Sequence, residues 1–184
     1  MAGHPLAKLA TRPYHHNPMT YDPTIHHRRS IRLPGYDYSQ PGAYFVTIVT
    51  HHREHLFGEI INGDMRLNKM GLIVQYAWHD LPKWHLHVRL GAFCIMPNHV
   101  HAIIILVDAA FPKRHALPEI VRGFKSRSAQ RINVLRKKPG VPVWHRNYYE
   151  HIIRNDDEHN RIHLYLQSNP ANWMEDAENS GMIK

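Results

Sequence analysis

The stretch of sequence that decides the fold is residues 87–107, HVRLGAFCIMPNHVHAIIILV. It contains two apolar runs, residues 87–96 and 100–107, separated by the dipeptide Pro97-Asn98. Proline and asparagine favour turns, and apolar runs of this length are typical of buried strands. The stretch therefore predicts two adjacent antiparallel strands.

Two histidines, His99 and His101, stand at the start of the second run with Val100 between them. Side chains alternate between the faces of a strand, so both imidazoles point the same way, about 7 Å apart at Cα. Two such imidazoles can bind one metal ion. The pair alone is weak evidence, because a chain with 18 histidines contains such pairs by chance.

Further strands and helices are predicted on both sides of this stretch. Residues 43–50 form a β-branched and aromatic run after a Gln-Pro-Gly turn signal, which predicts a strand. Apolar residues that lie on one helical face predict helices over residues 68–79 and 117–135. A shorter helix is predicted over residues 156–168, because Asp156 and Asp157 favour a helix start and Pro170 stops the helix. This order, with no internal repeat, indicates an α+β domain in which helices pack on one antiparallel sheet.

The chain length suits one domain with flanking segments. We expect residues 1–27 to be a disordered arm rich in His and Pro, residues 28–174 to be the domain and residues 175–184 to be a polar tail. No segment resembles a membrane span or a signal peptide, so we expect a soluble, cytoplasmic protein. The single cysteine, Cys94, lies in an apolar run and suits a reducing compartment.

The net charge of +8 is concentrated in one segment of the chain. Residues 113–138 contain nine Lys or Arg and one acid, Glu119, whereas the rest of the chain is neutral overall. Positive charge concentrated on one helix is what a polyanion such as nucleic acid requires. The alternative is a solvated helix face with no partner.

The last predicted helix carries Tyr165 and, four residues later, Asn169. Residues spaced by four lie on one helical face, so the phenol and the carboxamide can address the same point. The alternative is a core tyrosine followed by a helix-ending Asn-Pro. A site of two imidazoles and an amide oxygen leaves room for phosphate oxygens, which suits Mg²⁺ or Mn²⁺ better than a structural zinc site.

Four segments, in their order and spacing, resemble the HUH single-tyrosine transposases, and most closely the REP-associated tyrosine transposases. They are MPNHVHAIII (96–105), VRGFKSRSAQRIN (121–133), VWHRNYYEHIIRNDDE (143–158) and YLQSNPANW (165–173). The resemblance implies a ferredoxin-like (RRM-like) α+β domain, usually a homodimer, that recognises hairpins in single-stranded DNA. It also implies cleavage and rejoining of that DNA through a 5′-phosphotyrosine intermediate.

Residue by residue, the resemblance assigns His99 and His101 to the metal-binding pair and Tyr165 to the nucleophile. Asn169 matches the polar residue that completes the metal site, although the proline after it disfavours a helical conformation there. Tyr148 and Tyr149 are the rival nucleophiles, and we interpret them as packing or base-stacking residues.

Two alternatives to such an enzyme remain. One is a catalytically silent DNA- or RNA-binding regulator on the same fold, and the other is a metallohydrolase acting on a small substrate. Retention of both histidines and of the tyrosine favours the enzyme, and the basic helix disfavours the hydrolase. In the enzyme, backbone phosphates are assigned to the basic helix and unpaired bases to three aromatic residues. The residues assigned in this way are Arg122, Lys125, Arg127, Arg131, Trp144, Tyr148 and Tyr149.

Overall fold

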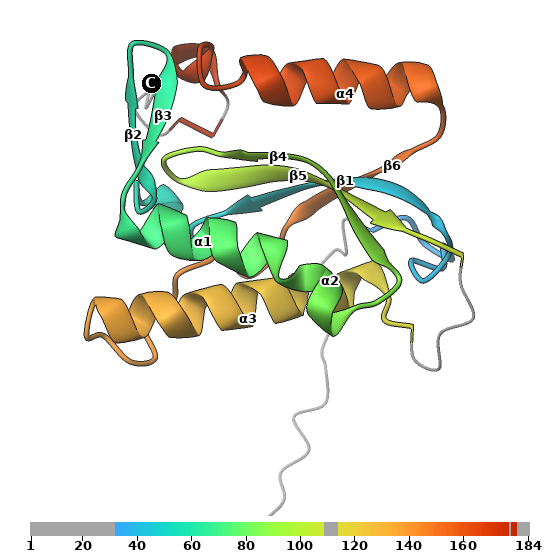
Figure 1. The fold of residues 1–184 in the computed structure, drawn as a ribbon, viewed down its shortest axis with the longest axis horizontal. Helices are drawn as coiled ribbons and strands as arrows, with labels where there is room; N and C mark the ends of the chain where they lie inside the picture. The colour runs from blue at the N-terminus through green and yellow to red at the C-terminus, as the bar shows by residue number, and fades with distance from the viewer. Residues whose placement is uncertain (1–31, 109–113, 177, 180–184) are drawn as a thin grey trace, which may run out of the picture. The chain divides into compact units, whose positions relative to one another are not determined.

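The two apolar runs form neighbouring strands, β4 (Val88–Ile95) and β5 (His99–Leu106), which pair antiparallel as predicted. The other two strands of the sheet are β1 (Gly42–Val49) and β6 (Tyr149–Ile153). All neighbouring strands are antiparallel, in the order β4-β5-β1-β6. The computed structural model describes residues 32–108, 114–176 and 178–179 (Figure 1).

Three helices cover one face of this sheet, and a fourth lies on the opposite face (Figure 1). The first group is α1 (Lys69–His79), α2 (Leu81–Trp84) and α3 (Leu117–Leu135), and the fourth helix is α4 (Asp156–Ser168). Helix α1 connects β1 to β4, and α3 connects β5 to β6. Two such β-α-β units in one antiparallel sheet make a ferredoxin-like fold, which confirms the predicted fold class.

Asparagine side chains start two of these helices. The side chain of Asn68 accepts hydrogen bonds from the backbone N–H groups of Met70 and Gly71, at 2.8 and 3.0 Å. The side chain of Asn155 accepts one from the N–H of Glu158 at 2.8 Å. Such caps satisfy donors that have no partner within the helix, so α1 and α4 begin where the sequence predicts.

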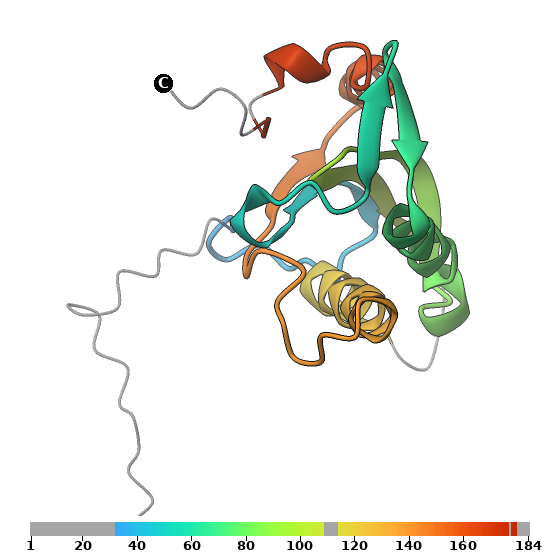
Figure 2. The same cartoon turned by 90° about the vertical axis from the view of Figure 1, so that its left-hand side faces the viewer.

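A β-hairpin that we did not predict precedes α1. It consists of β2 (Gly58–Ile61) and β3 (Asp64–Leu67), joined by Asn62 and Gly63 with positive φ angles of 54° and 82°. Asn-Gly is the preferred sequence for a two-residue hairpin turn because both residues tolerate positive φ, so a signal was present. The turn reaches the segment after α4, where a Cβ on Gly63 would lie 3.7 Å from the Cα of Ala171 (Figures 1 and 2).

The sheet has a separate core on each face. Val46, Val100 and Ala102 belong to the larger core, which includes residues of α1 and α3. Helices α1 and α3 lie side by side beneath that face (Figure 2). Cys94 and Met96 belong to the smaller core, with residues of α4 and of the segment that follows it. The alternation of side chains along β5 therefore points His99 and His101 toward α4, away from the basic helix.

Two short 3-10 helices complete the described structure, η1 (His51–Arg53) and η2 (Trp173–Glu175). The predicted arm, residues 1–27, lies outside the described residues, and the domain limits of 28–174 stay a prediction. Within the described ranges, no helix is both long and apolar enough to span a membrane.

Candidate metal and tyrosine site

The two histidines of β5 converge on one point, as their spacing predicts. His99 and His101 are 0% and 4% exposed, and their Nε2 atoms lie 2.9 Å apart. Neighbouring ligand atoms are about 3 Å apart around an ion with bonds of about 2.0–2.1 Å at right angles. The separation of the two nitrogens therefore fits two ligands of one metal ion.

The proton on His99 is placed by its hydrogen bonds. Its Nδ1 lies 2.8 Å from Oδ1 of Asn98, whose Nδ2 donates to the backbone carbonyls of Glu178 (2.7 Å) and Arg53 (3.3 Å). The amide orientation is thereby fixed, so Oδ1 accepts and Nδ1 of His99 carries the proton. The lone pair of His99 then lies on Nε2 and faces His101. Such a partner behind the ring is typical of histidines that bind metals.

His101 is held from two sides. Its Nδ1 lies 2.8 Å from Oγ1 of Thr47, the residue directly opposite it on β1, and its ring stacks on Phe45 at 5.5 Å. A hydroxyl can donate or accept, so Thr47 accommodates either tautomer of the imidazole. Two imidazole nitrogens 2.9 Å apart need a proton or a cation between them. Because Thr47 accommodates both tautomers of His101, a metal ion can replace the proton between the two Nε2 atoms.

Asp176 is a third member of the site that we did not predict, because we placed residues 175–184 in a polar tail. Its Oδ2 lies 3.8 Å from Nε2 of His99 and 4.0 Å from Nε2 of His101. Burial alone would raise the pKa of Asp176, but the neighbouring imidazole of His101 and a hydrogen bond from the N–H of Glu178 bring it down to about 2. Burial, together with His101, lowers the pKa of His99 to about 3. An ionised carboxylate beside a neutral imidazole is the state that metal binding requires.

Tyr165 and Asn169 reach the same place from α4. The phenol oxygen of Tyr165 lies 3.3 Å from Nε2 of His101, and its ring is 46% exposed. Burial and the nearby carboxylate of Asp176 raise the pKa of Tyr165, and a hydrogen bond from Asn169 lowers it only in part. The hydroxyl is therefore protonated at neutral pH unless a positive charge approaches it.

Asn169 continues the helical conformation despite the proline that follows it, with φ −57° and ψ −44°. The prediction that the proline disfavours a helical conformation at Asn169 was therefore wrong. Its side chain is 3% exposed, and Oδ1 is buried with no hydrogen-bond partner among the described residues. A buried acceptor without a partner is costly, and a cation at the site would satisfy it.

The donor set of this site consists of nitrogen and oxygen atoms. Cys94 is the register partner of His101 on β4, but burial raises the pKa of its thiol to about 12, so it is protonated and no ligand. Two imidazoles, a carboxylate and an amide oxygen suit a hard or intermediate divalent ion. The residues present therefore fit Mg²⁺ or Mn²⁺, and Asp176 adds a negative charge that the predicted ligand set lacked.

The basic helix lies across the sheet from this site, and two of its four assigned cations form hydrogen bonds or an ion pair with the protein. Lys125 donates to the backbone carbonyls of His145 and Arg146 at 2.6 and 2.8 Å, and burial lowers its pKa to about 8. Arg131 pairs with Asp80 at 3.5 Å. Lys125 thus holds the loop after α3, which leaves it poorly placed for phosphate.

The three aromatic residues assigned to base stacking differ in exposure. Trp144 is 7% exposed, and its Nε1 donates to Oγ of Ser128, so it packs in the larger core. The hydroxyl of Tyr148 is also buried. Tyr149 is 53% exposed and lies opposite Thr47 in the β1–β6 pairing, on the same face as His101. Only Tyr149 of the three has a ring available beside the site.

Comparisons with known proteins find relatives in sequence and in fold. The family model for IS200-like transposases matches residues 43–169. An uncharacterized protein of Haemophilus influenzae is 41% identical over 172 residues, covering 85% of this chain and 95% of that protein. A solved structure of a REP-associated tyrosine transposase bound to a REP hairpin covers 79% of this chain and 74% of its own, with a TM-score of 0.57 and 18% identity. A crystal structure from Deinococcus radiodurans R1 covers 74% of this chain and 95% of its own, with a TM-score of 0.46 and 20% identity.

The family match and the fold together define the class as the HUH single-tyrosine transposases, which confirms the resemblance found in the sequence. The chain belongs to the IS200-like transposase family.

Proposed function

We propose that this protein cleaves and rejoins single-stranded DNA through a covalent bond between Tyr165 and a 5′-phosphate, with a divalent metal ion held by the histidine pair. The observation that carries the proposal is the meeting of Tyr165, His99, His101 and Asp176 on one face of the sheet. The phenol oxygen and the Asp176 carboxylate both lie within 4.0 Å of Nε2 of His101. A nucleophile and a metal-binding group so close together suit phosphoryl transfer.

The metal would be held by His99, His101 and Asp176, with Oδ1 of Asn169 as a further donor. When bound, Mg²⁺ or Mn²⁺ supplies Lewis-acid stabilisation of the charge on the phosphoryl group. The raised pKa of Tyr165 supports this arrangement, because the phenol needs a nearby positive charge to lose its proton. The half-exposed ring leaves the oxygen open to a strand that approaches from solvent.

The chemical step is balanced without an external energy source. The phenolate oxygen of Tyr165 forms a bond to phosphorus, the bond from phosphorus to the 3′-oxygen breaks, and that oxygen takes a proton. A 3′-hydroxyl of the same or another strand then attacks the phosphotyrosine, which restores the phosphodiester and the tyrosine. The covalent intermediate retains the energy of the broken bond, so no nucleoside triphosphate is required.

Hairpin-forming DNA is the substrate that we propose, and a homodimer is the proposed assembly. The similarity in fold to a REP-associated transposase bound to a REP hairpin supports the hairpin substrate. The family resemblance supports both the hairpin substrate and the homodimer. The test is incubation of the full chain with labelled single-stranded hairpins taken from the DNA that flanks its gene. A denaturation-resistant adduct that requires Mg²⁺ or Mn²⁺ is the expected result. Binding without cleavage would instead support the silent regulator.

Tyr149 provides a test of how the strand is held beside the nucleophile. Replacing Tyr149 with alanine removes an exposed ring on the site's face, and base stacking is worth about 1–3 kcal/mol. We expect the dissociation constant for single-stranded DNA to rise by roughly 5- to 150-fold. Fluorescence anisotropy without metal measures it, and Tyr149→Phe, which keeps a ring, is the control. Equal weakening in both variants would refute stacking.

A further inference from the structure

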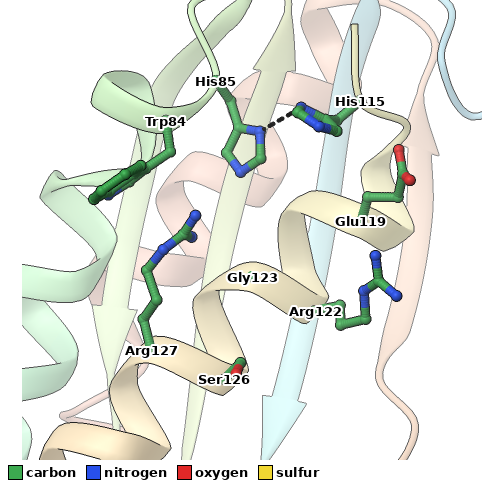
Figure 3. Close-up of a pocket in the computed structure, with 8 residues that line it drawn as sticks. All are labelled: Trp84, His85, His115, Glu119, Arg122, Gly123, Ser126 and Arg127. Atoms are coloured by element: carbon green, nitrogen blue, oxygen red, sulfur yellow. Dashed lines mark hydrogen bonds between the residues drawn. The ribbon is translucent and has the colours of Figure 1, made fainter. Parts of the chain in front are cut away.

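A cavity lies on the sheet face opposite to the metal and tyrosine site. It is formed by the end of α2, the residue that follows it and the first half of α3, and its volume is about 520 Å³ (Figure 3). The lining includes Trp84, His85, Arg122, Gly123 and Arg127. This volume falls within the range of about 300–1,000 Å³ that is typical of small-ligand sites. We call this cavity the α2–α3 pocket.

Two residues that line the pocket each have a nitrogen atom without a protein partner. Nε2 of His85 and Nη1 of Arg127 are buried and have no hydrogen-bond partner among the described residues. Figure 3 shows the His85 ring and the Arg127 guanidinium directed toward one another, while the other ring nitrogen, Nδ1, lies 3.0 Å from Nδ1 of His115. A guanidinium offers only donors, so a group that satisfies both atoms must present acceptors.

His85 can supply a donor as well. Burial, together with His115 and Arg127, lowers the pKa of His85 to about 4, so its ring is neutral at pH 7 and carries one proton. When His115 donates to Nδ1, that proton lies on Nε2, on the side of the ring that faces Arg127 (Figure 3). Two neighbouring donors then converge on the same space, which is the arrangement that binds an oxyanion.

The charges around the pocket favour an anion. Arg122 and Arg127 both line it, and the one acid beside them, Glu119, accepts a hydrogen bond from the backbone N–H of Ala116 at 3.2 Å. Glu119 thereby caps the start of α3 and does not pair with either arginine in the ion pairs of the described residues. The balance of charge at the pocket is positive, as a phosphate group requires.

Gly123 and Trp84 position the Arg127 guanidinium. A Cβ on Gly123 would lie 2.8 Å from Nη1 of Arg127, so the glycine provides the space in which the guanidinium rests. The guanidinium carbon lies 4.8 Å from the centre of the Trp84 ring, and that ring is 57% exposed. Trp84 thus presents an open aromatic surface beside a fixed cation, and bases stack on such surfaces.

We propose that the α2–α3 pocket binds one nucleotide of a single-stranded DNA segment. Its phosphate contacts Arg127, Arg122 and Nε2 of His85, and its base stacks on Trp84. The inference rests on the DNA-cleaving function proposed above and extends it, because it places a nucleotide on the face opposite to the cleavage site.

The test compares two variants that remove the same charge from the basic segment. Arg127→Gln removes a cation that lines the pocket, whereas Lys138→Gln removes an exposed cation after α3 that does not line it. Both are made in the full chain carrying Tyr165→Phe, and binding of a labelled single-stranded oligonucleotide is measured by anisotropy. We expect Arg127→Gln to weaken binding roughly 10- to 100-fold and Lys138→Gln by about twofold. Equal effects of the two variants, or no effect of Arg127→Gln, would overturn the proposal.

Two further variants keep the test valid if Arg127→Gln fails to fold. Gly123→Ala leaves the charge unchanged but displaces the Arg127 guanidinium, and Trp84→Ala removes the exposed ring. Each should weaken oligonucleotide binding at least about fivefold, with urea unfolding used to verify the fold. Native affinity in both folded variants would also overturn the proposal.

Competition distinguishes a strand from a small phosphate compound. Inorganic phosphate and deoxyadenosine monophosphate should displace the oligonucleotide only at concentrations far above the dissociation constant of the oligonucleotide. If either compound displaced the oligonucleotide at a concentration equal to that dissociation constant, the pocket would be a site for small phosphate compounds. The proposal that it binds a DNA strand would then be refuted. If the native chain forms the tyrosine adduct while the pocket variants keep the oligonucleotide affinity of the Tyr165→Phe chain, only this inference fails. If the native chain forms no adduct but the pocket variants lose binding, the proposed function fails and the pocket stands.

Discussion

Tyr165→Phe is expected to abolish the covalent protein–DNA adduct and to lower strand cleavage by at least about a thousandfold. The phenol oxygen that would form the bond to phosphorus lies 3.3 Å from Nε2 of His101, and its ring is half exposed. Phenylalanine keeps the ring and its edge contact with Phe45, at 6.4 Å between centroids, so the fold should be retained. Affinity for single-stranded DNA without metal should stay within about twofold of native. Denaturing gels of labelled DNA measure the adduct.

Tyr149→Phe is the matched control for this experiment. Tyr149 lies on the same face of the sheet as Tyr165, and its ring also contacts Phe45 at 6.4 Å. Its hydroxyl has no hydrogen bond to the histidine pair in the described structure, so the adduct should persist in Tyr149→Phe. An adduct that survives in Tyr165→Phe, or that disappears in Tyr149→Phe, would assign the nucleophile elsewhere.

Replacing either His99 or His101 with alanine is expected to abolish the stabilisation of the protein by Mn²⁺ or Mg²⁺. Metal at 100 times its dissociation constant stabilises a protein by about 2.7 kcal/mol. For a chain of this size that corresponds to a rise in the melting temperature of about 5–11 °C. We expect this rise in the native chain and none in the histidine variants, because a single imidazole with a carboxylate is a weak site. Cleavage of single-stranded DNA should also be lost in the histidine variants.

The control here is His159→Ala, which removes a histidine of α4 whose ring stacks on His163 and not on the metal site. It should keep the full rise in melting temperature. The variants of His99 lose some stability without metal, about 1–3 kcal/mol, because Oδ1 of Asn98 loses its donor in a buried place. A metal-induced rise in His99→Ala equal to that of the native chain would show that the ion binds elsewhere.

Much of the sheet and of the site could be predicted because the signals are local. The alternation of side chains along residues 99–106 suffices to bring His99 and His101 together, and a run of 19 helical residues gives α3 its limits. Asp176 could not be found in this way. It lies in a polar segment without periodicity, and it reaches the histidines through a 3-10 turn and through contacts with residues far away in the chain, such as the bond from Asn98 to the carbonyl of Glu178.

The place of the basic helix depends on topology and not on its own sequence. Helices α1 and α3 both cross between parallel strands of the sheet, and such crossovers are nearly always right-handed, so both helices fall on one face. Helix α4 follows the last strand and covers the other face. Charge on α3 therefore indicated a polyanion without indicating that Lys125 would hold a loop or that Arg127 would line a separate pocket.

The last described residues of the chain have a practical consequence for anyone who engineers it. They look dispensable in sequence, yet one of them supplies a carboxylate to the histidines and another supplies the carbonyl that orients the amide of Asn98. Deleting the segment from residue 176 onward would leave the amide of Asn98 with only its longer hydrogen bond, to the carbonyl of Arg53 at 3.3 Å. The orientation of that amide, and with it the position of the proton on His99, would be held less firmly. Removing Asp176 and Glu178 is therefore a change to the chemistry of this protein.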